Sequence, residues 1–377
     1  AQHRLCHTDG KIPLRNQRIM IAVIADDITG AAEMAGIAHR LGLSVSMSTN
    51  PKDLPPCDVS VIATDTRSMT ETEAAEVSAK TAVALADMNS VEHIFKKTDS
   101  ALRGHVVAEL EALLRCSQYI QALYIPANPS KGRIIRDGVY YISGTPLDET
   151  DFSFDPEFPA LSSVLTTRFP DAGMKKVLFA DAVSEEDINK EVDNADGYTL
   201  LAGAADLFTA FLKKHCRCNT VAQKRPDINL HDALIICGST QSRPIDCSVD
   251  TFHMPTDLYE GTSTPDKWIK ELSGKYSISH SMILAIRDRH RIGKESAIYL
   301  RETMAETVRG LTDIHTPREL IIEGGATAYA SLQKLGWDTF TITDEIAPGV
   351  IRMRAPNGTH VTMKPGSYPW GGLFPSK

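Results

Sequence analysis

From residue 19 onward, short apolar runs alternate with longer segments in which apolar residues recur every three or four positions. This alternation is typical of βαβ units that build a mainly parallel sheet. In the first unit, residues 19–25 (IMIAVIA) predict a buried strand, residues 26–30 (DDITG) the turn at its carboxyl end, and residues 31–41 a helix. Gly42 follows that helix, and glycine commonly ends helices because it adopts the left-handed conformation without strain. The pattern therefore predicts an α/β fold.

The same alternation continues along the first half of the chain. A helix is predicted at residues 70–88, where Ser68 and Glu71 have the spacing of a capping box. Residues 126–159 are rich in Pro, Gly and Asp, which predicts a long loop with a hairpin at residues 139–143. Loops of this length in compact domains are commonly functional. Further strands are predicted at residues 44–47, 59–63, 93–97 and 122–126.

A second α/β series begins after residue 230. Residues 216–230 have no apolar period and include a proline, so we expect a linker there. Residues 350–365 predict a hairpin around Asn357-Gly358, a strong turn signal. The elements predicted between them are strands at 233–237, 282–286, 319–322 and 339–343 and helices at 294–311 and 327–335.

These patterns predict an α/β protein of two α/β domains with mainly parallel sheets and an active-site cleft between the domains. We expect an N-terminal domain at residues 19–225 and a C-terminal domain at residues 226–377. Residues 1–18 are polar and patternless, which predicts a disordered tail.

Composition and charge exclude several classes of protein. The 377 residues are 42% hydrophobic and 23% charged, enough to bury one or two full cores. The net charge is −8 and the basic residues are spread along the chain, so no footprint for nucleic acid is visible. No apolar run has the roughly 18 to 20 residues of a membrane helix, and no signal-peptide pattern is visible at the N-terminus. We therefore expect a cytoplasmic protein without a nucleic-acid or membrane partner.

Seven scattered cysteines do not form the dense framework of a small disulfide-rich domain, so we expect reduced thiols. His215, Cys216 and Cys218 are close in sequence but lack a second ligand pair at the spacing of a zinc site. No metal site is predicted there.

Polar residues follow three predicted strands of the first half, at residues 26–30, 64–68 and 97–103. Ligands of open parallel sheets bind at the carboxyl ends of the strands. If these strands are neighbours, their carboxylates can accept hydrogen bonds from sugar hydroxyls, while Arg and Lys can pair with a ligand carboxylate. The sequence therefore predicts a hydroxylated acid as the ligand.

Each of these residues also has a structural interpretation. Asp27 or Thr29 can cap the following helix, because Asp and Thr commonly accept hydrogen bonds from free amides there. Arg67 can be a solvated surface residue. Arg103 can serve only to pair with Asp99, one turn earlier in a possible helix.

The second half offers two turns suited to phosphate. Strand 233–237 leads into residues 238–242 (GSTQS), and strand 319–322 leads into residues 323–327 (EGGAT) at the start of a helix. Glycines permit close approach of the backbone to a phosphate, and the helix N-terminus supplies free amides. Neither G-x-G-x-x-G after the first strand nor a Walker P-loop is present, so a nucleotide would be held in another way.

Taken together and in order, seven motifs resemble the four-carbon acid sugar kinase family, whose members phosphorylate D-threonate, D-erythronate or 3-oxo-tetronate. The motifs are VIADDITGA (23–31), KKTDSALRG (96–104), P-A-x-P-x-x-G-R (126–133), CGSTQS (237–242), EGGATA (323–328), IAPGV (346–350) and MKPGSY (363–368). The resemblance implies an N-terminal domain that binds the acid sugar and a C-terminal domain that binds ATP.

The resemblance also implies which residues form the site. We expect ATP with Mg²⁺ as the phosphoryl donor and a possible homodimer, and phosphoryl transfer then depends on positioning and on neutralising the γ-phosphate charge. The candidate catalytic residues are Asp26, Asp27 and Asp99. The candidate substrate-binding residues are Asp26, Arg67, Lys97, Thr98, Asp99, Ser100 and Arg103. The candidate nucleotide-binding residues are Ser239, Gly324, Gly325, Ala326, Thr327 and Gly366.

Two alternatives stay open. Family members often carry Glu where this chain has Ala326, and the tail PGSYPWGG departs from the usual S-G-N-F-G. These departures allow a catalytically inactive protein that binds or senses a sugar acid. A kinase of another small hydroxy acid is the other alternative.

Overall fold

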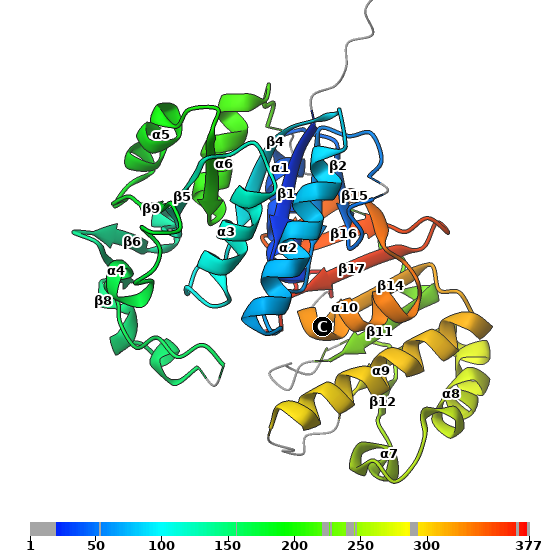
Figure 1. Cartoon of the computed structure of the whole chain (residues 1–377). Helices are drawn as coiled ribbons and strands as arrows, with labels where there is room; N and C mark the ends of the chain where they lie inside the picture. Colours follow the sequence, from blue (N-terminus) through cyan, green and yellow to red (C-terminus); the bar gives the residue numbers. More distant parts are fainter. Residues whose placement is uncertain are drawn as a thin grey trace, which may run out of the picture.

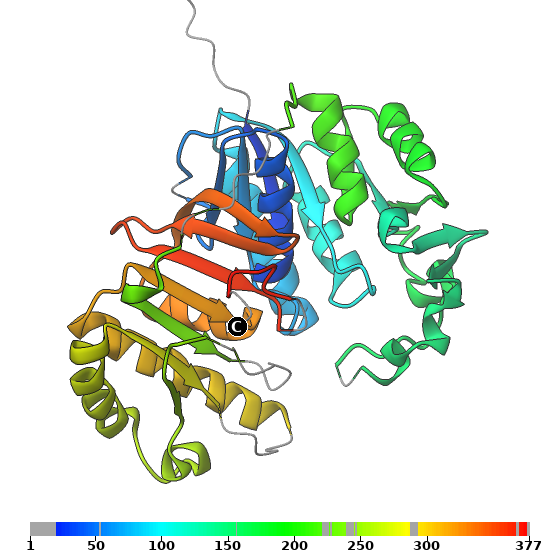
Figure 2. The same cartoon turned by 180° about the vertical axis from the view of Figure 1, so that it is seen from behind.

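The computed structural model describes residues 20–52, 54–155, 157–220, 226, 228–238, 245, 247–286, 293–366 and 369–374. The tail predicted at residues 1–18 lies outside the described residues, as does part of the predicted linker. Fourteen of the strands form one sheet whose two halves lie in separate lobes (Figure 1). The same two lobes are seen from behind in Figure 2.

In the N-terminal lobe, seven parallel strands are ordered β2-β3-β1-β4-β10-β5-β9. Strand β1 lies inside the sheet between β3 and β4, and all six of its residues are buried, which explains its uninterrupted apolar sequence. The strands are β1 (Met20–Ala25), β2 (Val45–Ser48), β3 (Val59–Ala63), β4 (Val91–Lys97), β5 (Gln121–Ile125), β9 (Val177–Phe179) and β10 (Thr199–Gly203).

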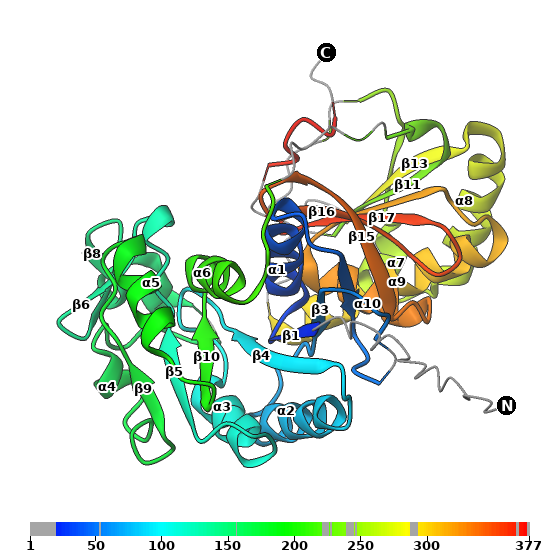
Figure 3. The same ribbon diagram turned by 90° about the horizontal axis from the view of Figure 1, so that it is seen from above.

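Helices cover both faces of this half of the sheet. Seen from above, α2 and α3 lie on one face, and α1 and α6 lie on the other (Figure 3). The helices are α1 (Ile28–Arg40), α2 (Glu71–Ala86), α3 (Val106–Arg115), α4 (Leu165–Arg168), α5 (Glu185–Asn194) and α6 (Ala205–His215).

A small second sheet follows β5 within the segment predicted as a long loop. Its three antiparallel strands are β6 (Arg133–Arg136), β7 (Val139–Ile142) and β8 (Thr145–Pro146). The hairpin predicted at residues 139–143 is therefore larger than expected. Its first turn is at Asp137-Gly138, where both residues have positive φ.

The C-terminal lobe continues the main sheet in the order β12-β13-β11-β14-β17-β16-β15. The first five of these strands are parallel, and β15 and β16 are antiparallel to their neighbours. The strands are β11 (Ala233–Cys237), β12 (Thr251–His253), β13 (Ser281–Ala285), β14 (Glu319–Glu323), β15 (Thr339–Ala347), β16 (Val350–Arg354) and β17 (His360–Lys364). The helices are α7 (Thr256–Glu260), α8 (Pro265–Ser279), α9 (Lys294–Ile314) and α10 (Gly325–Lys334).

One strand pair joins the two halves of the sheet. Strand β15 runs antiparallel to β2, with Phe340 opposite Met47. Helix α1 also contacts β15 and β16, so it packs on elements of both lobes. The two separate sheets expected from the sequence are therefore hydrogen-bonded into one.

The α/β class, the mainly parallel sheet and the hairpin around Asn357-Gly358 are confirmed. The capping box predicted for Ser68 and Glu71 is wrong. Thr70 caps α2 and shares the box with Glu73, and Ser68 instead donates a hydrogen bond to Glu157.

Candidate active site

The three polar turns of the first half lie side by side. Strand β1 is hydrogen-bonded to β3 on one side and to β4 on the other, with Ala25 level with both Ala63 and Lys97. The turns that follow these strands therefore share one edge of the sheet, as the sequence predicted if the strands were neighbours.

Arg67 connects the aspartates of these turns. Its Nε and Nη2 atoms donate to the two carboxylate oxygens of Asp26 at 2.8 and 3.0 Å, which is a bidentate pair. Its Nη1 atom donates to Asp27 at 2.9 Å and lies 3.6 Å from an oxygen of Asp99. Gly104 passes close to the pair with φ +92°, and a Cβ there would lie 3.3 Å from Asp26 Oδ2. Arg67 is thus a largely buried cation shared by three carboxylates and not a solvated surface arginine.

Asp27 has the capping role considered for it, and it also pairs with Arg67. It is the N-cap of α1, where its Oδ1 accepts a hydrogen bond from the amide of Gly30 at 2.8 Å. Its Oδ2 accepts from the hydroxyl of Thr29 at 2.5 Å and from Arg67. Capping therefore aims the Asp27 carboxylate at Arg67.

Asp99 is held by a second arginine. Arg103 Nε and Nη2 donate to its two oxygens at 3.0 and 2.9 Å. Burial alone would raise the pKa of Asp99, but the charges of Arg67 and Arg103 and the Arg103 hydrogen bond outweigh burial, so the pKa lies well below its ordinary value. Arg103 precedes α3 and does not lie inside a helix, because Leu102 and Gly104 have positive φ.

The remaining predicted substrate residues border the same turns. Lys97 is buried, donates to the carbonyl of Thr98 at 2.9 Å and lies 3.5 Å from Glu33 of α1. The hydroxyl of Ser100 accepts a hydrogen bond from Arg133, a residue of the P-A-x-P-x-x-G-R motif. Charged and hydroxyl groups from four segments therefore meet at this edge.

The two glycine-containing turns of the second half, at Gly238 and at residues 324–327, also lie next to each other. Side chains at Gly238 and Gly325 would clash with neighbouring atoms. A Cβ on Gly238 would lie 2.2 Å from the hydroxyl oxygen of Thr327, and Gly324 has φ +102° at the N-cap of α10. A Cβ on Gly325 would lie 2.4 Å from the Thr29 methyl. The N-terminus of α10 therefore touches the N-terminus of α1 across the two lobes.

A buried ion pair lies beneath the second of these turns. Lys364 pairs with Glu323, and both side chains are buried. The Lys364 amine also donates to the carbonyls of Pro365 at 3.1 Å and Gly366 at 3.3 Å. Because one ammonium group holds all three partners, the pair fixes the tail turn next to the glycine turn.

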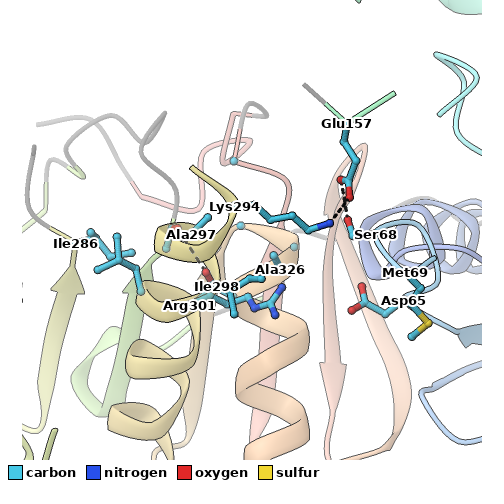
Figure 4. A pocket seen from close by; sticks show the side chains of 16 residues that line it. Asp65, Ser68, Met69, Glu157, Ile286, Lys294, Ala297, Ile298, Arg301 and Ala326 are labelled. Carbon is cyan, nitrogen blue, oxygen red and sulfur yellow. Dashed lines mark hydrogen bonds and ion pairs between the residues drawn. The ribbon is translucent and has the colours of Figure 1, made fainter. Parts of the chain in front are cut away.

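A cavity of about 780 Å³ opens between the lobes (Figure 4). The first half contributes Asp65, Ser68, Met69 and Glu157 to its lining. The second half contributes residues of α9 together with Gly238, Gly324, Gly325, Ala326, Thr327 and Gly366. All of the predicted nucleotide residues that the structure describes therefore line it, while Ser239 lies outside the described residues.

Two domain families match the chain on either side of this cavity. Residues 21–195 match a family described as a sugar-binding N-terminal domain, and residues 275–368 match one described as a nucleotide-binding C-terminal domain. One chain therefore matches both domain families. These two matches and the names of the curated relatives confirm the resemblance predicted from the seven motifs.

The curated relatives that the chain matches have names that agree with the resemblance. A D-threonate kinase of Salmonella typhimurium is 34% identical over 143 residues, which are 37% of this chain and 34% of the relative. A D-erythronate kinase of Heliobacterium modesticaldum is 31% identical over 37% of this chain and 33% of its own. These matches span about a third of the relatives' length. A 3-oxo-tetronate kinase of Cupriavidus necator is 22% identical over 88% of this chain and 90% of its own.

Solved structures share the fold of this protein over nearly the whole chain. A Haemophilus influenzae protein has a TM-score of 0.71 at 20% identity and covers 94% of this chain and 98% of its own. A protein of Salmonella typhimurium LT2 has a TM-score of 0.76 at 18% identity with the same coverage. Both support the arrangement of two lobes.

Several lining residues were missed by the sequence analysis. Lys294 and Arg301 are seven positions apart on α9 and therefore lie on one face of the helix, toward the cavity. The Lys294 amine donates to Glu157 at 2.9 Å, and Glu157 also accepts from Ser68 at 3.0 Å (Figure 4). Only the polar end of strand β3 signalled Asp65 and Ser68 in advance. None of the seven predicted acid-binding residues lines the cavity itself within the described part of the chain; Arg67 is two residues from Asp65, which does.

Among the residues that the structure describes, no group of three or more His, Cys, Asp or Glu side chains could hold a metal ion. No helix in the described ranges is long and apolar enough to cross a membrane.

Proposed function

We propose that this protein is an ATP-dependent kinase of carbohydrate metabolism that phosphorylates the terminal hydroxyl of a four-carbon sugar acid. The observation that carries the proposal is the cavity between the lobes. Glycine turns suited to phosphate line one side of it, and Asp65, which lies two residues before Arg67 in the turn after β3, lines the other side. The names of the curated relatives support D-threonate, D-erythronate or 3-oxo-tetronate as the acceptor.

The acid sugar binds at the arginine and lysine edge of the first sheet. Arg67 and Lys97 pair with the substrate carboxylate, with Arg103 beside them. The hydroxyls of Thr98 and Ser100 bind the sugar hydroxyls. Asp26, Asp27 and Asp99 already accept hydrogen bonds from arginines, so they hold the cations in place and orient hydroxyls of the substrate.

ATP binds along the glycine turns of the second lobe. The amides at the N-terminus of α10, from Gly325 to Thr327, face its phosphates, and Gly366 closes the other side. Ser239 is a further predicted contact. Bound Mg²⁺ would neutralise charge on the phosphates.

A coupled assay of ADP release tests the proposal. The purified chain is given Mg-ATP and a panel of D-threonate, D-erythronate, 3-oxo-tetronate and the uncharged polyols erythritol and threitol. We expect turnover with at least one acid and none with the polyols, because the polyols lack the carboxylate that Arg67 and Lys97 would bind. ³¹P NMR of the product checks that the terminal oxygen carries the phosphate.

Thermal unfolding with each ligand separates the alternatives. A kinase is stabilised by Mg-ATP and by its acid, since each binds the native state. A protein stabilised by an acid sugar but not by Mg-ATP would instead be a binding or sensing protein. Folded protein that binds Mg-ATP but turns over none of the acids would reject the proposed substrate class.

A further inference from the structure

Asp65 stands apart from the other aspartates of the site. It follows β3 and lines the main cavity together with the glycine turn 324–327. It also lines a second cavity of about 260 Å³ with Arg301 and Tyr329, so its side chain lies where the two cavities adjoin. Figure 4 shows it on the N-terminal side of the main cavity, facing the helices of the C-terminal lobe.

The carboxylate of Asp65 has no hydrogen bond or ion pair with any residue that the structure describes. Both carboxylate oxygens of Asp26 accept hydrogen bonds from Arg67, and both carboxylate oxygens of Asp99 accept hydrogen bonds from Arg103. The carboxylate of Asp27 accepts three hydrogen bonds. Of these four aspartates, Asp65 is therefore the one whose carboxylate no described residue occupies.

The backbone holds Asp65 in a sparsely populated conformation. Its φ is +51°, and residues on both sides are fixed by hydrogen bonds. The amide of Thr64 donates to the carbonyl of Ala25 at 2.9 Å, and the amide of Arg67 donates to the carbonyl of Asp26 at 3.1 Å. Left-handed residues other than glycine concentrate at functional sites, where surrounding structure maintains them.

Charged residues from several elements act on Asp65. Burial raises its pKa to about 7; Arg301 of α9 lowers it, Asp27 raises it, Arg67 lowers it and Asp26 raises it. Tyr329 of α10 is also close, since the charge of Asp65 contributes to the raised pKa of the Tyr329 hydroxyl. A carboxylate that titrates near neutral pH can both accept and release a proton.

We infer that Asp65 is the general base of the proposed kinase reaction, taking the proton from the substrate hydroxyl. As that hydroxyl oxygen bonds to the γ-phosphorus, its proton moves to an Asp65 carboxylate oxygen. The bond from the γ-phosphorus to the bridging oxygen breaks, and its electron pair stays on ADP. Asp65 then releases the proton to water. This inference rests on the proposed function, since it assigns a role within the same site.

The Asp65→Asn variant tests the role, with Asp137→Asn as its matched control. Asp137 also has φ +51° but is exposed at the β6–β7 turn, away from the cavity. Asn tolerates the left-handed conformation, so both variants should fold. We expect Asp65→Asn to lower kcat by about 10² to 10⁴-fold with ADP affinity, measured by calorimetry, within threefold of wild type. Asp137→Asn should match wild type.

The pH profile distinguishes catalysis from a structural role. Wild-type kcat/KM should fall tenfold per pH unit below about pH 7, and this limb should vanish in Asp65→Asn. Thermal unfolding gives a readout without turnover. The unfolded chain ionises this carboxyl from about pH 4 upward, whereas the folded chain ionises it only near pH 7, so the carboxyl lowers stability progressively over this interval. Asp65→Asn should therefore raise Tm most above pH 7, by an amount that shrinks as the pH falls toward 4.

The outcomes separate this inference from the proposed function. A wild type that turns over no acid rejects the proposed function, and the role of Asp65 with it. An active wild type whose Asp65→Asn variant keeps its rate within threefold, or keeps the acidic limb, rejects the role alone. A Tm difference that does not change with pH also counts against it.

Discussion

At the scale of single residues, Arg67 determines whether the aspartates of the site can stay buried together. Removing it in Arg67→Ala leaves three neighbouring carboxylates without their shared cation. We expect a loss of about 3 to 5 kcal/mol in the free energy of unfolding at pH 7. Binding of the sugar acid should be lost as well. Urea unfolding and calorimetry measure the two effects.

Arg309→Ala is the control for this prediction. Arg309 also pairs with two carboxylates, Glu306 and Asp313, but it is 41% exposed on α9. Solvent screens exposed ion pairs, so Arg309→Ala should remain close to wild type in stability. Equal losses in the two variants would show that burial of Arg67 does not matter.

Asp99 gives the site a predictable acid dependence. Its folded pKa is lowered, so the unfolded chain takes up this proton first as the pH falls. The stabilisation is therefore complete above about pH 5 and is lost as the pH falls through the unfolded value near 3.9 toward the folded pKa. The Asp99→Asn variant lacks this pH-dependent stabilisation. Urea unfolding should show a deficit relative to wild type at pH 7 that narrows between pH 5 and 3.5, and a constant deficit would contradict the account.

At the scale of secondary-structure elements, the sequence was informative where a local pattern is enough. The apolar runs located β1, β3 and β4, and the rule that parallel strands bind ligands at their carboxyl ends selected the turns that meet. The capping box shows the limit of this approach. Ser68–Glu71 and Thr70–Glu73 both have the required spacing, and the choice depends on Glu157, which is 89 positions from Ser68.

Lining residues contributed by folded-back segments were beyond local patterns. Glu157 comes from a segment whose place above the cavity depends on the small sheet β6–β8, and Lys294 begins a helix whose apolar spacing says nothing about its first residue. Asp65 was visible as a polar strand end, but the absence of an ion pair between it and any described residue depends on tertiary contacts. The polar residues of a site are thus predictable as a set, and their pairing is not.

The contact between the N-termini of α1 and α10 gives a prediction at the same scale. Gly325→Ala would place its Cβ 2.4 Å from the Thr29 methyl, so one helix must move. We expect a loss of about 1 to 3 kcal/mol in stability. Affinity for ADP should also fall, by calorimetry, because the displaced amides face the proposed phosphate site.

Thr29→Ser should rescue Gly325→Ala, because it removes that methyl and keeps the hydroxyl that bonds Asp27. The double variant should recover most of the stability and ADP affinity, with an interaction energy of the opposite sign to the loss. Gly274→Ala in α8 is the control, since a Cβ at Gly274 would have nothing within 4 Å and Ala favours a helix. No rescue by the double variant would place the defect elsewhere.

At the scale of the whole molecule, the continuous sheet limits how the two lobes can move. The β2–β15 pair and the packing of α1 on β15 and β16 join them at one side. On the cavity side, the bridge from Ser68 through Glu157 to Lys294 also connects them. The first connection is buried and the second is exposed, so any opening of the cavity would break the bridge first.

The exposed bridge makes a prediction about nucleotide affinity. Lys294 lines the cavity beside the glycine turn, yet Glu157 neutralises its charge. ATP phosphates would compete with Glu157 for Lys294. Glu157→Gln should therefore tighten ADP and ATP binding by a few-fold and Lys294→Ala should weaken it by a similar factor, since about 1 kcal/mol corresponds to about fivefold in Kd. Stability should change by less than about 1 kcal/mol in both, because the Lys294 side chain is 66% exposed.

Calorimetry at two salt concentrations decides whether Glu157 competes with the nucleotide or holds the cavity ready for it. Competition predicts opposite changes in Kd for the two variants, and both changes should shrink at high salt as the charges are screened. If the bridge instead holds the lobes in a binding-competent arrangement, Glu157→Gln and Lys294→Ala should weaken binding alike. Glu149→Gln removes the same charge from an exposed position of the same segment, so an effect of equal size there would reduce the result to net charge alone. Opposite signs with a silent Glu149→Gln would establish that Glu157 occupies the place of a phosphate at Lys294.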